Sequence, residues 1–200
     1  MVCDLQNELI EKLIKEQNGI IKTAEVLALG VTKDEFYRYV EAAGLEKAAH
    51  GIYTSPDMLQ DEMYLLQAQY PKAIYSHEAA LFLHGLAEKE PLPFTVTVQS
   101  GHNASALKKK GVKVYYAKKE WYELGITEIS SLGGHTVKVY DMERTICDII
   151  RKRSEMDIAV FNYALKEYAK RKDKDTAKLN RYAKAMRLER KIDIIMGVLF

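Results

Sequence analysis

The chain has 200 residues, enough for one large domain or two modest ones. Its composition, 48% hydrophobic and 29% charged with only 4 Pro and 11 Gly, excludes a disordered or fibrous protein and is typical of a globular one. The two cysteines, Cys3 and Cys147, form no C-x-x-C pair, so we expect neither a disulfide framework nor a zinc ribbon. Without a secretory leader or an apolar run of roughly 18 residues, we expect a cytoplasmic protein with no membrane partner.

The net charge of +2 conceals a gradient along the chain. Residues 1–58 carry a net charge of −4, residues 59–148 carry −1, and residues 149–200 carry +7. Because a polyanion responds to local potential, the C-terminal quarter is either a polyanion-binding surface or an ordinary solvated helical face. The candidate side chains for this basic face are Lys170, Arg171, Lys178 and Arg181.

The N-terminal segment predicts three helices. Apolar residues recur at helical spacing over residues 5–14, and Thr23 is expected to cap a second helix that runs to Leu29. The third helix opens with a T-x-x-E capping box, residues 32–35, and ends at Gly44. We expect Phe36, Val40 and Ala43 to face the core from this third helix. Two short helices that meet across a tight turn indicate a helix-turn-helix.

Two short strands, 45–47 and 52–54, follow the third helix and predict a small hairpin. A hairpin in this position is the wing of a winged helix-turn-helix, which we expect over residues 1–57. Winged helices bind DNA or dock proteins, and residues 19–54 hold 4 basic against 5 acidic groups, so both readings stay open.

The rest of the chain, residues 58–200, predicts a mixed α/β domain. A helix over about residues 59–69 and a capped helix from Ser76 to Gly85 precede three segments of period-two alternation. These segments, 94–98, 112–116 and 136–140, predict strands of one sheet between about residues 94 and 140. Asp141 is expected to cap a helix that opens a helical, basic tail over about 141–200. The expected fold class is α+β.

The residues expected to contact DNA lie on the third helix, on the hairpin and at the start of the second helix. The N-terminal, solvent-facing part of a recognition helix reaches base edges, and an Arg fork matches two acceptors on guanine. A helix N-terminus and a neighbouring cation can bind phosphate. The predicted DNA-binding residues are Lys22, Thr23, Lys33, Tyr37, Arg38, Lys47 and His50.

Two further groups of polar residues contain side chains of the types that bind metal ions. His77 and His84 share a helical face but lack the H-E-x-x-H pattern, so we expect them to be partly buried and hydrogen-bonded. The carboxylates of Asp141, Glu143 and Asp148 would suit a metal-dependent nuclease, yet Arg144 and Asp148 have the spacing of a helix-surface pair. No cofactor-binding motif is present, and no metal, cofactor or catalysis is expected.

Four segments carry the most specific pattern of the chain: residues 19–25, 44–54, 76–86 and 139–148. In this order and spacing they resemble the AbiEi-type antitoxins of bacterial abortive-infection (type IV) toxin–antitoxin systems. The resemblance implies that the N-terminal winged helix binds promoter inverted repeats and represses its own operon, associating with the nucleoid when bound. It also implies that the C-terminal domain opposes a nucleotidyltransferase-like toxin without needing to bind it. A nuclease targeted by a winged helix and a ligand-sensing transcription factor are the alternatives.

Overall fold

A computed structural model describes residues 2–56 and 60–199 and divides the chain into two compact units. Unit 1 comprises residues 1–69 and 130–136, and unit 2 comprises residues 70–129 and 137–200. The chain mixes helices with two small sheets, which confirms the α+β class. The predicted domain boundary, between residues 57 and 58, lies outside the described residues.

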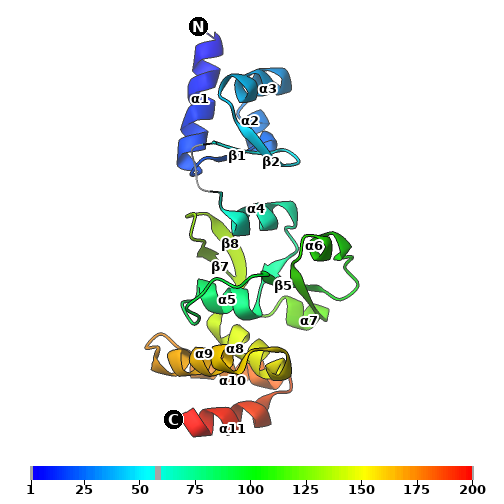
Figure 1. The fold of residues 1–200 in the computed structure, drawn as a ribbon, viewed down its shortest axis with the longest axis vertical. Coiled ribbons are helices and arrows are strands. Elements are labelled where there is room, and N and C mark those ends of the chain that lie inside the picture. Colours follow the sequence, from blue (N-terminus) through cyan, green and yellow to red (C-terminus); the bar gives the residue numbers. More distant parts are fainter. Residues whose placement is uncertain (1, 57–59, 200) are drawn as a thin grey trace. The chain divides into compact units, whose positions relative to one another are not determined.

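Unit 1 combines helices with a three-stranded antiparallel sheet whose strand order is β1-β3-β2 (Figure 1). Sequence patterns did not predict β1, a three-residue strand that pairs with β3 next to the hairpin. The elements of unit 1 are α1 (Val2–Glu16), β1 (Ile20–Lys22), α2 (Thr23–Ala28), α3 (Lys33–Ala42), β2 (Glu46–Ala49), β3 (Ile52–Thr54) and α4 (Glu62–Gln69).

Local capping signals place α3 as predicted, but two expectations near it are wrong. Thr32 Oγ1 accepts from the Glu35 backbone, and the Glu35 carboxylate accepts from the Thr32 backbone, so the capping box is present. The N-cap of α2 is Lys22 rather than Thr23, because Thr23 already has helical geometry and its hydroxyl makes no capping bond. Ala43 is exposed, since it lies one residue beyond the end of α3.

The core of unit 1 forms where the helices meet β1 and β3. Its buried members include Ile10 of α1, Ile21 of β1, Val26 of α2 and Phe36 of α3. Phe36 packs edge-on against Tyr53 of β3, with ring centroids 5.4 Å apart. This packing fixes which side of α3 faces inward and leaves the opposite side to solvent.

A turn over residues 130–136 also belongs to unit 1 and is held there by polar contacts. Asp61 is buried, caps α4 through the Tyr64 backbone N–H (3.0 Å) and accepts from Ser131 Oγ. His135 Nδ1 lies 2.8 Å from Asp61 Oδ2, and its ring stacks on Tyr64 at a centroid distance of 4.4 Å. Gly133 packs so closely that a Cβ there would lie 2.6 Å from the Asp61 side chain.

Unit 2 is built on a five-stranded mixed sheet with the order β6-β5-β4-β8-β7. β5 and β6 are parallel and are joined through α6 (Ser105–Lys109), whereas β4 runs antiparallel to β5 and parallel to β8. The three predicted strands correspond to β5, β6 and β8. The strands are β4 (Ile74–Tyr75), β5 (Thr95–Gln99), β6 (Lys113–Ala117), β7 (Ile126–Ser130) and β8 (Thr136–Tyr140).

Helices α8 to α11 gather at one side of the unit 2 sheet and enclose an apolar core with α5 (Figure 1). Asp141 caps α8 through the Arg144 backbone N–H at 2.8 Å, as predicted. No described helix has the length and apolar character that crossing a membrane requires. The helices of unit 2 are α5 (His77–Leu83), α6 (Ser105–Lys109), α7 (Lys119–Tyr122), α8 (Met142–Arg151), α9 (Ile158–Lys170), α10 (Thr176–Ala185) and α11 (Glu189–Leu199), with a 3₁₀ turn at Arg153–Glu155.

The interpretation of Arg144 and Asp148 as a surface pair is wrong. Arg144 Nε lies 3.1 Å from Asp148 Oδ1, and the two side chains are only 2% and 7% exposed. The Arg144 guanidinium also donates to the backbone carbonyls of Trp121 and Leu124. The two side chains do form the pair that the i, i+4 spacing predicted, but they lie on the inward face of α8 and not on its surface.

Candidate nucleic-acid interface

The exposed side of α3 presents three of the predicted DNA-binding residues. Lys33, Tyr37 and Arg38 are all exposed, whereas Phe36 between them is fully buried. The Lys33 ammonium lies 5.6 Å from the centroid of the Tyr37 ring, so the two side chains form one contact surface. The capping box fixes the first turn of α3, and this surface is therefore carried on a rigid element.

The hairpin β2–β3 presents two more predicted residues. Lys47 of β2 and His50 of the turn are exposed, while the opposing strand β3 is buried. A left-handed Gly51, with φ of 68°, closes the turn beside Thr23. The hairpin therefore carries a lysine and a histidine beside α3.

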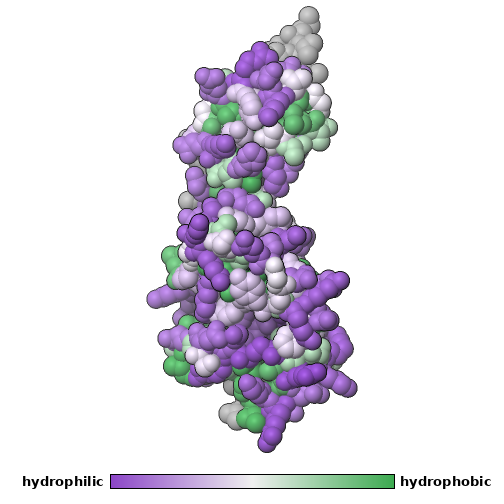
Figure 2. Space-filling view, turned by 90° about the vertical axis from the view of Figure 1, so that its right-hand side faces the viewer, coloured by the Kyte–Doolittle hydropathy of each residue, from purple (hydrophilic) through white to green (hydrophobic). Residues whose placement is uncertain are grey.

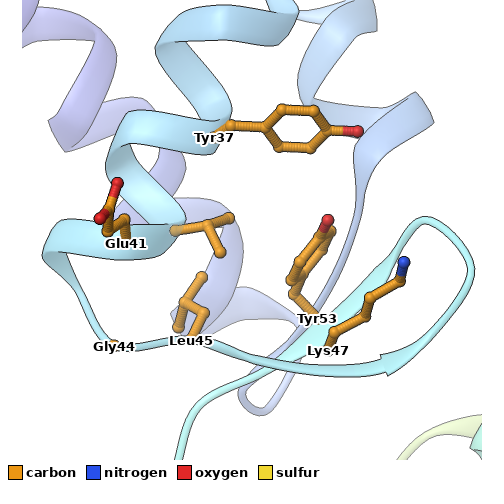
Figure 3. A pocket seen from close by; sticks show the side chains of 7 residues that line it. Tyr37, Glu41, Gly44, Leu45, Lys47 and Tyr53 are labelled. Carbon is orange, nitrogen blue, oxygen red and sulfur yellow. The ribbon is translucent and has the colours of Figure 1, made fainter.

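An open pocket of about 600 Å³ lies between the C-terminal half of α3 and this hairpin. Figure 3 shows the hydroxyl groups of Tyr37 and Tyr53 and the amino group of Lys47 on one side of the pocket and the carboxylate of Glu41 on the other. The pocket thus has a polar side suited to an anionic partner and an acidic side that disfavours one. Its lining is completed by Val40, Gly44 and Leu45.

Tyr53 also lines this pocket and was not among the residues predicted to contact DNA. Its ring centroid lies 6.4 Å from that of Tyr37, and the two rings link α3 to β3. Burial, reinforced by the Tyr37 hydroxyl, raises the pKa of Tyr53, so the phenol is neutral at physiological pH. A tyrosine in a three-residue strand gave no sequence signal of a contact with a helix 16 residues earlier.

The side chains of Lys22 and Thr23 lie against other residues of unit 1. They do not belong to the exposed surface of α3 that includes Arg38. Lys22 Nζ lies 3.3 Å from Glu25 Oε1 and 5.1 Å from the Tyr64 ring centroid. Burial opposes the charge of Lys22, but the Tyr64 hydroxyl and the Glu25 carboxylate together raise its pKa. The Thr23 hydroxyl is buried without a hydrogen-bond partner among the residues that the structure describes. The Lys22 side chain is 34% exposed, and the phosphate contact predicted for Lys22 and Thr23 stays a prediction.

The predicted basic face of unit 2 is largely paired with carboxylates. Lys170 Nζ lies 2.6 Å from Glu167, Arg171 Nε lies 2.7 Å from Asp173, and Lys178 lies 3.4 Å from both Asp141 and Glu143. Arg181 is exposed. Hydrophilic side chains cover most of the face that Figure 2 shows. Of these carboxylates, Asp141 and Glu143 lie outside residues 149–200, so Lys178 is paired with acidic groups that the net charge of +7 does not include.

The carboxylates considered for metal chemistry are engaged in hydrogen bonds within unit 2. Asp141 caps α8 and accepts from the Tyr182 hydroxyl, while Glu143 accepts from the Tyr168 hydroxyl and the Asp175 backbone. Over residues 2–56 and 60–199, no group of three or more His, Cys, Asp or Glu side chains is arranged to hold a metal ion.

His77, the first residue of α5, and His84, the residue after its end, are buried or partly buried and hydrogen-bonded, as predicted. His84 Nε2 donates to the Tyr140 carbonyl over 2.7 Å, and burial lowers the pKa of His84. His77 lies in the left-handed region with φ of 50°, pairs with Ser76 Oγ and stacks on Tyr115. Burial and three nearby cations, first among them Arg144, hold the pKa of His77 well below its usual range.

Comparison with known proteins addresses the fold. No protein-family model and no curated protein matches the chain. The structure is similar to the crystal structure of the RV2827C protein from Mycobacterium tuberculosis, with a TM-score of 0.59 and 11% sequence identity. The match covers 92% of this chain and 75% of that one. At this identity, the similarity shows that the two chains share a fold across both units.

Proposed function

We propose that this protein is a DNA-binding antitoxin that represses its own operon. In this proposal, unit 1 acts as a winged helix-turn-helix on promoter inverted repeats, and unit 2 opposes a nucleotidyltransferase-like toxin. The succession of α2, a tight turn, α3 and the β2–β3 hairpin supports the winged-helix interpretation of unit 1.

The proposal that unit 1 binds DNA is supported by α3, which has one side buried in the core and the other exposed to solvent. Phe36 anchors one side in the core, and Lys33, Tyr37 and Arg38 stand on the other. A helix held this way can lie in the major groove with its first turns toward the bases, where Arg38 reads guanine and Lys33 contacts phosphate. Lys47 and His50 would contact the backbone beside it.

The acidity of unit 1 shapes the expected binding mode. Few cations are available, and Lys22 is already paired with Glu25. Counterion release therefore involves few phosphates, and affinity should depend on base contacts more than in a strongly basic domain. Nonspecific binding is expected to be weak, which suits a repressor with few targets.

The antitoxin half rests on the resemblance of segments 76–86 and 139–148 to AbiEi-type antitoxins. Both segments lie in unit 2, where Ser76, His77 and Arg144 are buried and form part of its packing. These residues would maintain the fold, leaving exposed groups such as Arg181 as the candidates for antitoxin activity.

Titration of the intact chain with DNA tests the proposal. DNA from upstream of its own gene should bind more tightly than a shuffled sequence of equal length at physiological salt, and Lys47→Ala should reduce the salt slope by about one. Equal affinity for both DNAs would overturn the repressor half. Failure of the chain to rescue growth when coexpressed with the product of the adjacent gene would overturn the antitoxin half.

A further inference from the structure

A second pocket, of about 360 Å³, is lined entirely by residues of unit 2. Helix α9 forms one wall, and the segment that follows α5, residues 87–91, forms the other. The volume falls within the range of small-molecule sites, at its lower end. None of the predicted site residues lines this pocket.

The walls of the pocket are mainly apolar. Ala159, Val160 and Tyr163 follow one another along the first two turns of α9 and face the pocket together. Ala87 and Pro91 complete the apolar lining from the opposite segment. Such walls favour an aliphatic group over a strongly hydrated one.

The charged residues that line the pocket are predominantly acidic. Glu78, Glu88 and Glu90 contribute three carboxylates, of which Glu78 is paired with Lys113, and Lys89 contributes one cation. The Glu88 carboxylate also interacts with Tyr163 in the α9 wall, because burial and the Glu88 charge together raise the pKa of Tyr163. A cation is attracted to this lining and an anion is repelled.

Glu78 adds unused hydrogen-bonding capacity. Its Oε1 lies 3.2 Å from Lys113 Nζ, but Oε2 is buried with no hydrogen-bond partner among the described residues. A buried carboxylate oxygen without a donor is unfavourable, so a donor group that reached this side chain would be stabilised.

We propose that this pocket binds a small aliphatic amine. The alkyl stem packs between α9 and residues 87–91, and the ammonium group lies among the carboxylates of Glu78, Glu88 and Glu90. A neutral molecule of the same shape would gain only the apolar part of this interaction, and a carboxylate would be repelled. This site is independent of DNA binding, and it would make unit 2 responsive to a metabolite-sized ligand.

Calorimetric titration of the intact chain with hexylammonium tests the proposal, with hexanol and hexanoate as probes that share the stem. Hexylammonium should bind most tightly and hexanoate least, and affinity should fall as salt is added. Glu88→Gln should weaken binding about two- to fivefold and Lys89→Gln should strengthen it by a similar factor. The control Glu123→Gln, an exposed carboxylate of unit 2 outside the pocket, should change nothing.

A steric variant locates the binding site. Ala159→Phe fills the pocket from the exposed start of α9 and should abolish hexylammonium binding while the circular dichroism spectrum is retained. If that variant fails to fold, the opposite effects of Glu88→Gln and Lys89→Gln on the hexylammonium affinity decide whether this pocket is the binding site. The proposal is overturned if hexanol binds as tightly as hexylammonium, if Glu88→Gln and Glu123→Gln behave alike, or if only a lysine-rich peptide binds.

Discussion

The imidazole of His135 lies with Nδ1 2.8 Å from Oδ2 of Asp61, although 74 residues separate them in the sequence. Its Nε2 lies 2.9 Å from the Gln17 carbonyl at the end of α1. The two ring nitrogens thus face two hydrogen-bond acceptors, a carboxylate and a backbone carbonyl. A single side chain thus ties the 130–136 turn to two helices of unit 1.

Replacing His135 with Phe should preserve the stacking on Tyr64 but remove both hydrogen bonds. The buried Asp61 carboxylate would lose one of its hydrogen-bond donors, which typically costs about 1–3 kcal/mol. Urea unfolding followed by circular dichroism measures the loss, with His50→Phe on the exposed hairpin turn as the control. A free energy of unfolding within about 1 kcal/mol of the parent would mean that the contact contributes little.

Gly133→Ala should destabilise the protein through a steric clash. The added Cβ would lie 2.6 Å from the buried Asp61 side chain, and overpacking of this kind costs about 1–3 kcal/mol. Leu132→Ala is a matched control, because Leu132 is 77% exposed in the same turn. Equal thermal midpoints for the two variants would contradict the packing described here.

Acidification should destabilise unit 2 through His77. Its pKa in the folded protein is well below the ordinary value, so between these two values the unfolded chain binds a proton that the folded chain does not. Stability should therefore fall as the pH drops below about 6.5, at about 1.4 kcal/mol per pH unit for one group. His77→Asn, which tolerates the left-handed backbone, should flatten this slope by about one proton. Parallel slopes for parent and variant would show that His77 does not titrate on unfolding.

Asp148→Ala should be far more damaging than the loss of a surface carboxylate. It would leave the Arg144 guanidinium buried with only carbonyl partners, at a cost of about 3–5 kcal/mol. Glu155→Ala breaks a pair with Lys152 that is 39% and 46% exposed, and should change the free energy of unfolding by less than about 1 kcal/mol. Similar losses for the two variants would restore the surface interpretation of the Arg144 pair.

Sequence patterns predicted the features that depend on neighbouring residues. The Thr32–Glu35 capping box and the Asp141 cap are in place, and Gly44 has the left-handed backbone expected after α3. These signals act within a single helical turn, so the rest of the fold does not disturb them. The prediction that Thr23 caps α2 was wrong, because a threonine before an apolar run can occupy either the N-cap or the first helical position.

Contacts between distant segments were beyond prediction. Strand β1 is only three residues long and exists because β3 pairs with it, and the Asp61–His135 pair has no local signature. The spacing of Arg144 and Asp148 predicted that they would touch but carried no information on burial. For the candidate interface, the exposure of Arg38 followed from helical periodicity, whereas the contact of Lys22 with the Tyr64 ring of α4 joins segments that are distant in the sequence.

Equilibrium titration of Arg38→Ala against promoter DNA tests most directly whether α3 reads bases. The variant should lose about 1–3 kcal/mol of affinity for the promoter site and discriminate less well at one base pair. Lys12→Ala is the control, since Lys12 is an exposed cation of unit 1 that belongs to α1 and not to α3 or the hairpin. If Arg38→Ala and Lys12→Ala bind the promoter equally well, with the parent's sequence preference, α3 is not the recognition helix.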